Sequence, residues 1–159
     1  MDTTTVLALA FAIGIIAGLR TFTAPAVVSW AAHLSWLDLG STWAAFLGYA
    51  ATPYVVGLMA IGELINDKLP KTPSRKAPGP FAARIVVGAF SGAALCWAGK
   101  QSPLLGGLLG ALGAVAGTLG GYEARTRLVK ALGVPDLVIA LLEDAVAIGG
   151  GLFLVSRFS

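Results

Sequence analysis

The sequence is poor in charge, histidine and cysteine, and each scarcity excludes a class of protein. Charged residues make up 12% of the 159 residues, about half the share of a typical soluble domain, which excludes an ordinary soluble enzyme. The single cysteine, Cys96, excludes a disulfide-rich scaffold, and the single histidine, His33, excludes a histidine-rich metal centre. Phosphate-binding, serine-hydrolase and zinc-protease signatures are also missing. We therefore expect no enzymatic activity, no metal and no cofactor.

Apolar residues are abundant instead. They make up 57% of the chain, and the mean hydropathy is +0.83. Because a spanning helix needs about 20 apolar residues, the sequence predicts an all-α, polytopic membrane helical bundle of about five spans, with one domain over residues 1–159. The expected spans are 5–32, 41–67, 81–99, 103–132 and 135–155, and a basic, proline-rich loop covers 68–80.

The first two spans contain proline. Pro25 follows Arg20 closely, and Pro53 lies inside the second apolar segment. Proline lacks a backbone donor and crowds the preceding turn, so we predict a break between Arg20 and Pro25 and a kink at Pro53. Interrupted helices are tolerated in a membrane where protein or water satisfies the freed backbone groups, and transporters use them repeatedly.

The distribution of basic residues predicts the orientation. With five spans and the loop 68–80 in the cytoplasm, eight Lys and Arg residues lie on that side and two, Lys100 and Arg157, on the other. This excess follows the positive-inside rule and predicts a cytoplasmic N-terminus and a C-terminus on the opposite side. The net charge of +3 reflects the same loops, so we expect membrane lipids, and no nucleic acid, as partners.

Two pairs of segments resemble each other. Residues 14–18 match residues 113–117, and residues 58–67 match residues 137–146. In a five-span chain both pairs cross in opposite directions, which indicates an inverted repeat of the kind found in transporters. The alternative is chance similarity between apolar helices rich in small residues.

Glycines recur at four-residue spacing, as in Gly14/Gly18, Gly88/Gly92 and Gly106/Gly110. On a helix this spacing makes a smooth strip that lets a second helix approach closely. The strips predict tight packing inside one subunit or between subunits of a homo-oligomer. A sliding surface or a backbone-lined pore is the functional alternative.

Five ionisable side chains inside the spans form the candidate transport or ion-binding site: Arg20, Glu63, Asp67, Glu143 and Asp144. Such groups are expensive in a membrane and are usually functional or paired. In the structural interpretation, Arg20 simply pairs with Glu63 or Glu143. In the functional interpretation, the carboxylates face one another and bind a proton or cation. Four carboxylates against one arginine leave a negative surplus, so one of them should be protonated readily.

The loop 68–80 is the second candidate site. Lys71, Arg75 and Lys76 offer many donors over a short, proline-stiffened stretch. Positive-inside anchoring with attraction to anionic lipid explains them simply. The sharper interpretation is a clamp for lipid or phosphate head groups.

Residues 18–25 (GLRTFTAP) and 62–75 (GELINDKLPKTPSR) resemble motifs of a family of small bacterial integral membrane proteins catalogued as a domain of unknown function. The resemblance extends through Ala83–Ile85 and Gly88–Gly92 and so covers most of the chain. It implies a bacterial inner-membrane protein of four or five helices. It implies no activity and no residue roles.

The leading hypothesis is a small membrane transport protein that moves a small solute or ion, coupled to carboxylate protonation. The alternative is a non-transporting scaffold or anionic-lipid-binding module assembled through the glycine strips. Convergence of the five side chains on a water-accessible cavity favours transport. A tightly paired Arg20 in a dry core, with the other carboxylates at the interface, favours the scaffold.

Overall fold

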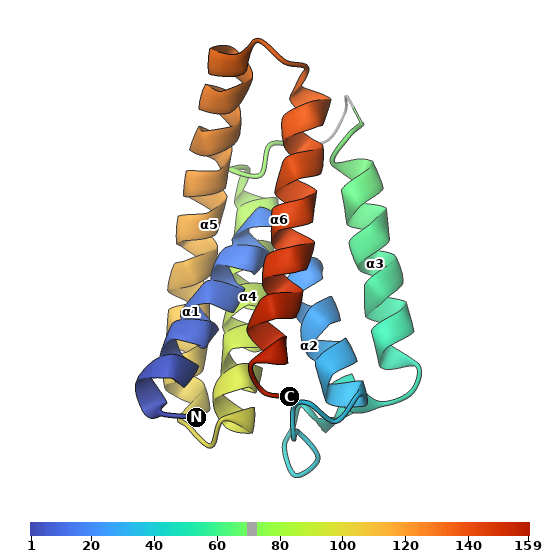
Figure 1. Cartoon of the computed structure of the whole chain (residues 1–159), viewed down its shortest axis with the longest axis vertical. Helices are drawn as coiled ribbons and strands as arrows, with labels where there is room; N and C mark the ends of the chain where they lie inside the picture. The colour runs from blue at the N-terminus through green and yellow to red at the C-terminus, as the bar shows by residue number, and fades with distance from the viewer. Residues whose placement is uncertain (70–72) are drawn as a thin grey trace.

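The computed structural model describes residues 1–69 and 73–159, and all regular structure within them is helical (Figure 1). This confirms the predicted all-α membrane bundle. The elements are α1 (Thr3–Leu19), α2 (Thr23–His33), the short 3₁₀ helix η1 (Ala45–Gly48), α3 (Thr52–Asn66), α4 (Pro78–Ala98), α5 (Pro103–Leu132) and α6 (Asp136–Ser156).

Local sequence signals set several helix ends. Asp2 caps α1 by accepting a hydrogen bond from the Thr5 amide at 3.0 Å, and the Thr5 hydroxyl and amide together lower the pKa of the Asp2 carboxyl. Proline stands in the first turn of α3, α4 and α5, where its missing N–H costs nothing. Pro53 lies in the first turn of α3 and not in the middle of a longer helix. The expected kink at this residue was therefore wrong. Gly133 ends α5 in a left-handed conformation, with φ of 62°.

The first apolar segment is a re-entrant hairpin. The chain is extended at Arg20, with φ of −140° and ψ of 112°, and α2 starts three residues later. This confirms the predicted break, because Pro25 lies in the first turn of α2, where a continuous helix would bring its ring against the carbonyl of Thr21. Figure 1 shows α1 rising from the N-terminus into the bundle and α2 returning to the same end. Residues 5–32 are thus not one span.

The number of long apolar helices also differs from the expected five. Among the described residues, α4, α5 and α6 are long and apolar enough to cross a membrane, and α1 is a shorter apolar helix. The expected span 41–67 contains a loop, η1 and the 15-residue α3. Both chain ends lie at the same end of the molecule (Figure 1). The prediction of termini on opposite sides was wrong, because it counted the hairpin as a crossing.

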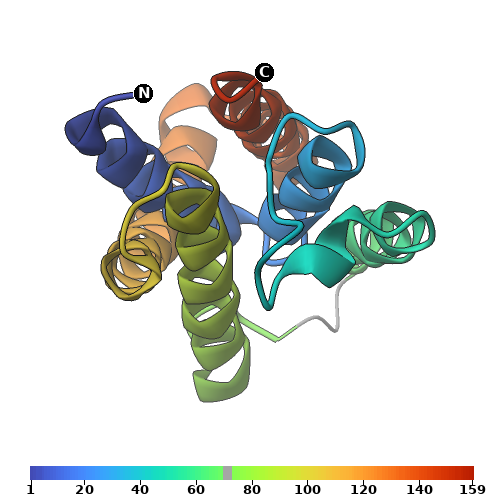
Figure 2. The same ribbon diagram turned by 90° about the horizontal axis from the view of Figure 1, so that it is seen from below.

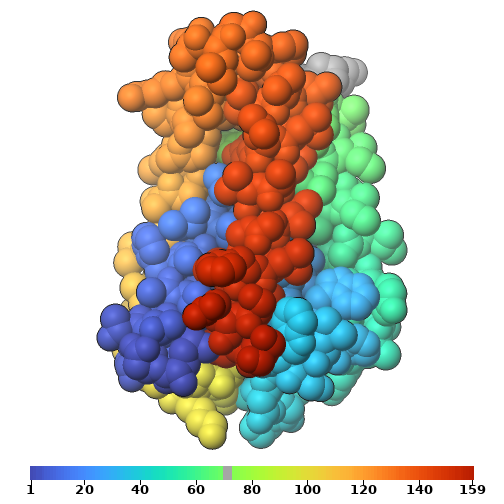
Figure 3. Space-filling model, viewed as in Figure 1, coloured from blue at the N-terminus to red at the C-terminus, as the bar shows by residue number. Residues whose placement is uncertain are grey.

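The outer faces of the long helices are apolar. Leu104, Leu108 and Leu112 on α5 are exposed, as are Leu142 and Phe153 on α6. A contiguous apolar exterior of this kind is expected where lipid, rather than water, surrounds a bundle. Figure 3 shows α6 on one face of the molecule, between α1 and the α2–α3 side.

The glycine strips hold α1, α4 and α5 together. A methyl group added at Gly110 would lie 2.1 Å from the carbonyl oxygen of Gly88, and one added at Gly14 would lie 2.1 Å from that of Gly110. A methyl group at Gly92 would lie 2.3 Å from the Gly106 carbonyl. Only glycine allows backbones this close. The strips therefore pack inside one chain, and α3 lies outside this unit beside α2 (Figure 2).

The same contacts give the direction of the helices. Gly14 lies against Gly110, and Gly18, four residues later, lies against Ala114 and Gly117. The residue numbers of α1 and α5 increase in the same direction along this contact, so the two helices run parallel. An inverted repeat requires these two segments to run in opposite directions. The expected inverted repeat is therefore wrong for this pair.

Candidate functional site

Arg20 lies at the tip of the re-entrant hairpin and is completely buried. Its Nε lies 2.6 Å from Oδ1 of Asp144, and its Nη1 lies 2.8 Å from Oδ2 of Asp67. Its Nη2 lies 3.6 Å from Oε2 of Glu143. Four of the five predicted site residues are thus brought together, from the α1–α2 break, the end of α3 and the upper half of α6.

Two cations that do not belong to the five-residue candidate transport site, Lys68 and Arg75, also bind these carboxylates. Nζ of Lys68 lies 2.6 Å from Oδ2 of Asp144. The Arg75 guanidinium binds both oxygens of Glu143, at 2.5 and 2.9 Å. Arg75 is therefore buried in this network and is not a free ligand for lipid head groups.

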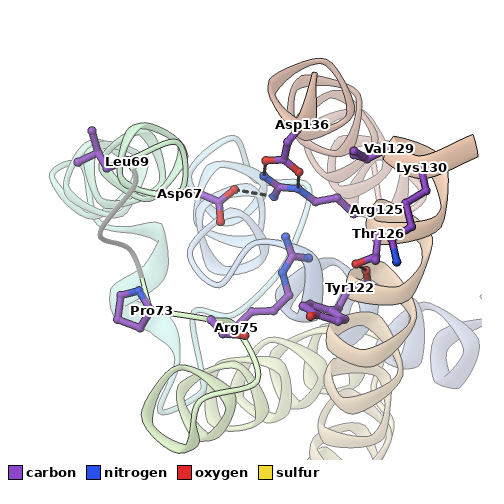
Figure 4. Close-up of a pocket in the computed structure, with 11 residues that line it drawn as sticks. Asp67, Leu69, Pro73, Arg75, Tyr122, Arg125, Thr126, Val129, Lys130 and Asp136 are labelled. Atoms are coloured by element: carbon purple, nitrogen blue, oxygen red, sulfur yellow. Dashed lines mark hydrogen bonds and ion pairs between the residues drawn. The ribbon is translucent and has the colours of Figure 1, made fainter. Parts of the chain in front are cut away.

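Arg125 on α5 joins three carboxylates. Its Nη1 lies 2.9 Å from Oδ2 of Asp67 and 3.4 Å from Oε2 of Glu143, and its Nη2 lies 2.6 Å from Oδ2 of Asp136. Figure 4 shows the bonds from Arg125 to Asp67 and Asp136, which connect α5 to α3 and α6. Arg125 was not among the predicted site residues; it was one of the eight basic residues counted on the cytoplasmic side. No sequence signal separates it from Arg127, which lies two residues later and is 77% exposed.

The network is balanced in charge, unlike the predicted negative surplus. Its cations are Arg20, Lys68, Arg75, Arg84 and Arg125, and its carboxylates are Glu63, Asp67, Asp136, Glu143 and Asp144. Five positive charges thus meet five negative charges. Repulsion among uncompensated carboxylates is no longer a reason to expect protonation of one of them.

Glu63 occupies a different position from the other carboxylates. Its two oxygens accept hydrogen bonds from the amides of Thr21 and Phe22, at 2.7 and 2.8 Å. These amides lie at the N-terminus of α2, which has no capping side chain at Phe22. The positive end of the helix dipole favours a negative group there. Only one arginine approaches Glu63: Nη2 of Arg84 lies 3.6 Å from Oε1.

Cavities bounded by the described residues adjoin this network, and two of them lie near the hairpin tip and the end of α3. The larger, here called the vestibule, has a volume of about 500 Å³ and is lined by residues that include Asp67, Pro73, Arg75, Arg125 and Lys130 (Figure 4). Its lining includes the end of α3, the end of α5 and the start of α6, which lie opposite the chain termini in Figure 1.

The smaller cavity, here called the inner pocket, has a volume of about 140 Å³, and its lining includes Thr21, Glu63 and Arg84. Asp67 and Pro73 line both cavities. The hairpin tip is therefore next to a solvent-accessible space.

Lys76 is the remaining predicted residue that the structure describes. Lys76 is exposed, and its Nζ lies 3.7 Å from the centre of the Tyr122 ring. Lys71 lies outside the described residues. Cys96 is buried beside Val6 and Ala10. Among residues 1–69 and 73–159, no group of three or more His, Cys, Asp or Glu side chains is placed to hold a metal ion.

Comparison with known proteins places the chain in a family without assigning it an activity. No curated protein and no solved structure matches it. One family model does match, over residues 7–156, and this range contains the hairpin, every member of the charge network and both cavities. The chain belongs to the family described as Domain of unknown function (DUF4126).

Proposed function

We propose that this protein moves a small solute or ion across a membrane by way of the vestibule and the hairpin tip. The observation that carries the proposal is the convergence of Arg20, Asp67, Glu143 and Asp144 beside a solvent-accessible cavity. Non-helical backbone inside a membrane protein is tolerated where it is buried in protein or lines a water-filled cavity. The break at Arg20 meets this condition.

The network also has a feature suited to movement. Asp67 is shared by Arg20 and Arg125, and Glu143 is shared by Arg20, Arg75 and Arg125. A carboxylate with several cationic neighbours can exchange one for another without passing through an unpaired, buried state, which is the costly one. Small rearrangements around the tip are therefore accessible to the folded protein.

The complete burial and ion pairing of Arg20 favour the scaffold alternative, but two other observations count against it. The glycine strips are used within the chain, and Arg75 is engaged by Glu143. Lys76 remains available for anionic lipid. Binding to anionic liposomes that is lost in Lys76→Gln, together with an absence of flux for every probe, would favour the scaffold.

Replacing Glu63 or Glu143 by glutamine should abolish flux and leave the bundle assembled. Glutamine keeps the size of each side chain but removes the charge that Thr21, Phe22 and Arg75 bind. The measurement is flux of bromide, sodium and glycerol into liposomes that contain the full chain, with size-exclusion chromatography as the assembly readout.

The matched control for both variants is Glu123→Gln, because Glu123 is an exposed glutamate of α5 whose ion pair is with Arg127 in the same helix. It should transport at the wild-type rate. Unchanged flux in both Glu63→Gln and Glu143→Gln would refute the proposed role of these residues.

We further propose a bacterial inner membrane as the location, with the vestibule end facing the cytoplasm. Lys68, Arg75 and Lys130 lie at this end, whereas Met1, Lys100 and Arg157 line one cavity at the other. The positive-inside rule then places both termini outside the cytoplasm, which reverses the sidedness expected for the N-terminus. A green fluorescent protein fused to Ser159 should stay dark, since it does not mature after export. Bright fluorescence at the membrane would contradict this orientation.

A further inference from the structure

The geometry points to a small inorganic anion as the transported solute, bound at the N-terminus of α2 in exchange with the carboxylate of Glu63. The inference rests on the proposed function and names its substrate class. The anion would accept hydrogen bonds from the amides of Thr21 and Phe22 and from the guanidinium of Arg84. It would occupy the inner pocket and the space that the Glu63 carboxylate leaves.

The first observation is the manner in which Glu63 is held. A carboxylate from α3 binds the backbone amides of Thr21 and Phe22, the two residues that immediately precede α2. Helix N-termini bind anions because their first amides have no partner within the helix and the helix dipole favours negative charge. Glu63 thus fills an anion site with a group on a flexible side chain, and a free anion could take its place.

The second observation is an under-used arginine beside this site. Arg84 is 6% exposed and lines the inner pocket. Within the described parts of the chain, its buried Nε has no hydrogen-bond partner, and its closest carboxylate contact is the 3.6 Å approach to Glu63. A buried guanidinium with unused donors is costly. A bound anion would supply the missing acceptor.

The chemistry of the other unpartnered groups favours an anion over a cation. Over the described residues, the buried side-chain atoms with neither a hydrogen bond nor an ion pair are Nε of Arg84 and the hydroxyl oxygens of Thr23 and Ser91. No carboxylate oxygen is among them. The Nη atoms of Arg20 are ion-paired with Asp67 and Glu143. A metal cation needs free oxygen ligands, whereas guanidinium nitrogens can only donate. Thr23 is the first residue of α2 and is 3% exposed, so its hydroxyl adds a further donor near this helix end.

The route into the inner pocket and the volume of this pocket also fit a small inorganic anion. The described part of the vestibule lining carries three cations, Arg75, Arg125 and Lys130, and two carboxylates, Asp67 and Asp136. The cations are in excess by one, and a positively charged cleft concentrates anions. The vestibule adjoins the inner pocket at Asp67 and Pro73. At about 140 Å³, the inner pocket is smaller than the roughly 300–1,000 Å³ typical of sites for organic ligands. A halide or nitrate ion fits this volume better than an organic solute or a lipid head group.

The test is titration of the purified full chain in detergent with sodium bromide, followed by calorimetry, with sodium gluconate as the control salt. Glu63→Gln removes the competing charge and should bind bromide about tenfold more tightly than the wild type, the effect of roughly one charge-assisted hydrogen bond. Arg84→Gln should bind about tenfold more weakly for the same reason. Arg84→Lys keeps the charge without the Nε donor and should also bind more weakly than the wild type.

Matched controls separate the site from general charge effects. Glu123→Gln and Arg127→Gln make the same chemical changes in an exposed ion pair of α5 and should leave bromide affinity unchanged. Equal affinity in the wild type, Glu63→Gln and the folded Arg84 variants would overturn the inference. Binding of sodium, rather than bromide, that depends on Glu63 would overturn it as well.

The inference and the proposed function fail in different ways. Bromide binding that follows the expected order, with no flux in liposomes, would support the anion site and refute transport. Flux of sodium or glycerol without any bromide binding would refute the anion site and leave transport in place. Bromide binding and bromide flux, both altered in Arg84→Lys, would support the two together.

Discussion

Replacing Arg20 by methionine should destabilise the folded bundle by about 3–5 kcal/mol, the cost of removing one partner from a buried ion pair. Arg20 is completely buried, and it faces Asp67, Glu143 and Asp144. Methionine has a similar length but leaves three carboxylates with less positive charge. The measurement is the midpoint of thermal unfolding in detergent, read as loss of the monodisperse size-exclusion peak.

Two further variants make this result specific. Arg127→Met removes an arginine that is 77% exposed, and it should leave the unfolding midpoint nearly unchanged. The double variant Arg20→Met with Asp144→Asn should be less destabilised than the sum of the two single variants, because each removes the partner of the other. Strict additivity, or a midpoint equal to that of the wild type in Arg20→Met, would show that the ion pairs do not stabilise the hairpin tip.

Replacing Gly110 by alanine should also destabilise the bundle, by about 1–3 kcal/mol, which is the usual cost of overpacking a well-packed core. The new methyl group would lie 2.1 Å from the Gly88 carbonyl oxygen, and backbone cannot move aside as a flexible side chain can. The other two atoms nearest to this methyl group, the carbonyl carbon of Gly88 and Cα of Gly92, also belong to the α4 backbone, so α4 and α5 must move apart. The same thermal assay measures the effect.

Gly120→Ala is the matched control because it makes the same change in the same helix. Nothing lies within 4 Å of a methyl group at Gly120. Alanine there should be neutral or stabilising by about 0.5–1 kcal/mol, since alanine restricts the unfolded chain more than glycine does. If Gly110→Ala and Gly120→Ala unfold at the same temperature, the glycine strips are not the contact that holds α1, α4 and α5 together.

The protein combines a rigid part with a part that can rearrange. A rigid glycine-packed unit of α1, α4 and α5 supports a hairpin tip that is held by ion pairs. The helices are packed backbone to backbone, so they have little room to slide. The ion pairs share partners and can rearrange. We therefore expect any motion that accompanies the proposed transport to occur around the tip and α3.

The sequence was sufficient to predict the all-helical class and the break in the first apolar segment. Long apolar runs permit only helices in a membrane, and the proline in the first turn of α2 interrupts one of them near Arg20. The sequence also identified Arg20, Glu63, Asp67, Glu143 and Asp144 as unusual, because charge inside an apolar run is expensive wherever it lies. The motifs at residues 18–25 and 62–75 also indicated the family, and the family match over residues 7–156 confirms that resemblance.

Only the tertiary structure decided where the chain goes after the break and which charges meet. A break does not determine whether the next helix continues or turns back, so the hairpin, the parallel direction of α1 and α5, and the common end of both termini were not predictable. Arg75 was predicted to bind lipid or phosphate head groups and Arg125 was counted among the cytoplasmic basic residues, yet both lie against Glu143. Apolar pattern is a local property of the sequence, whereas the pairing of charges depends on which segments the fold brings together.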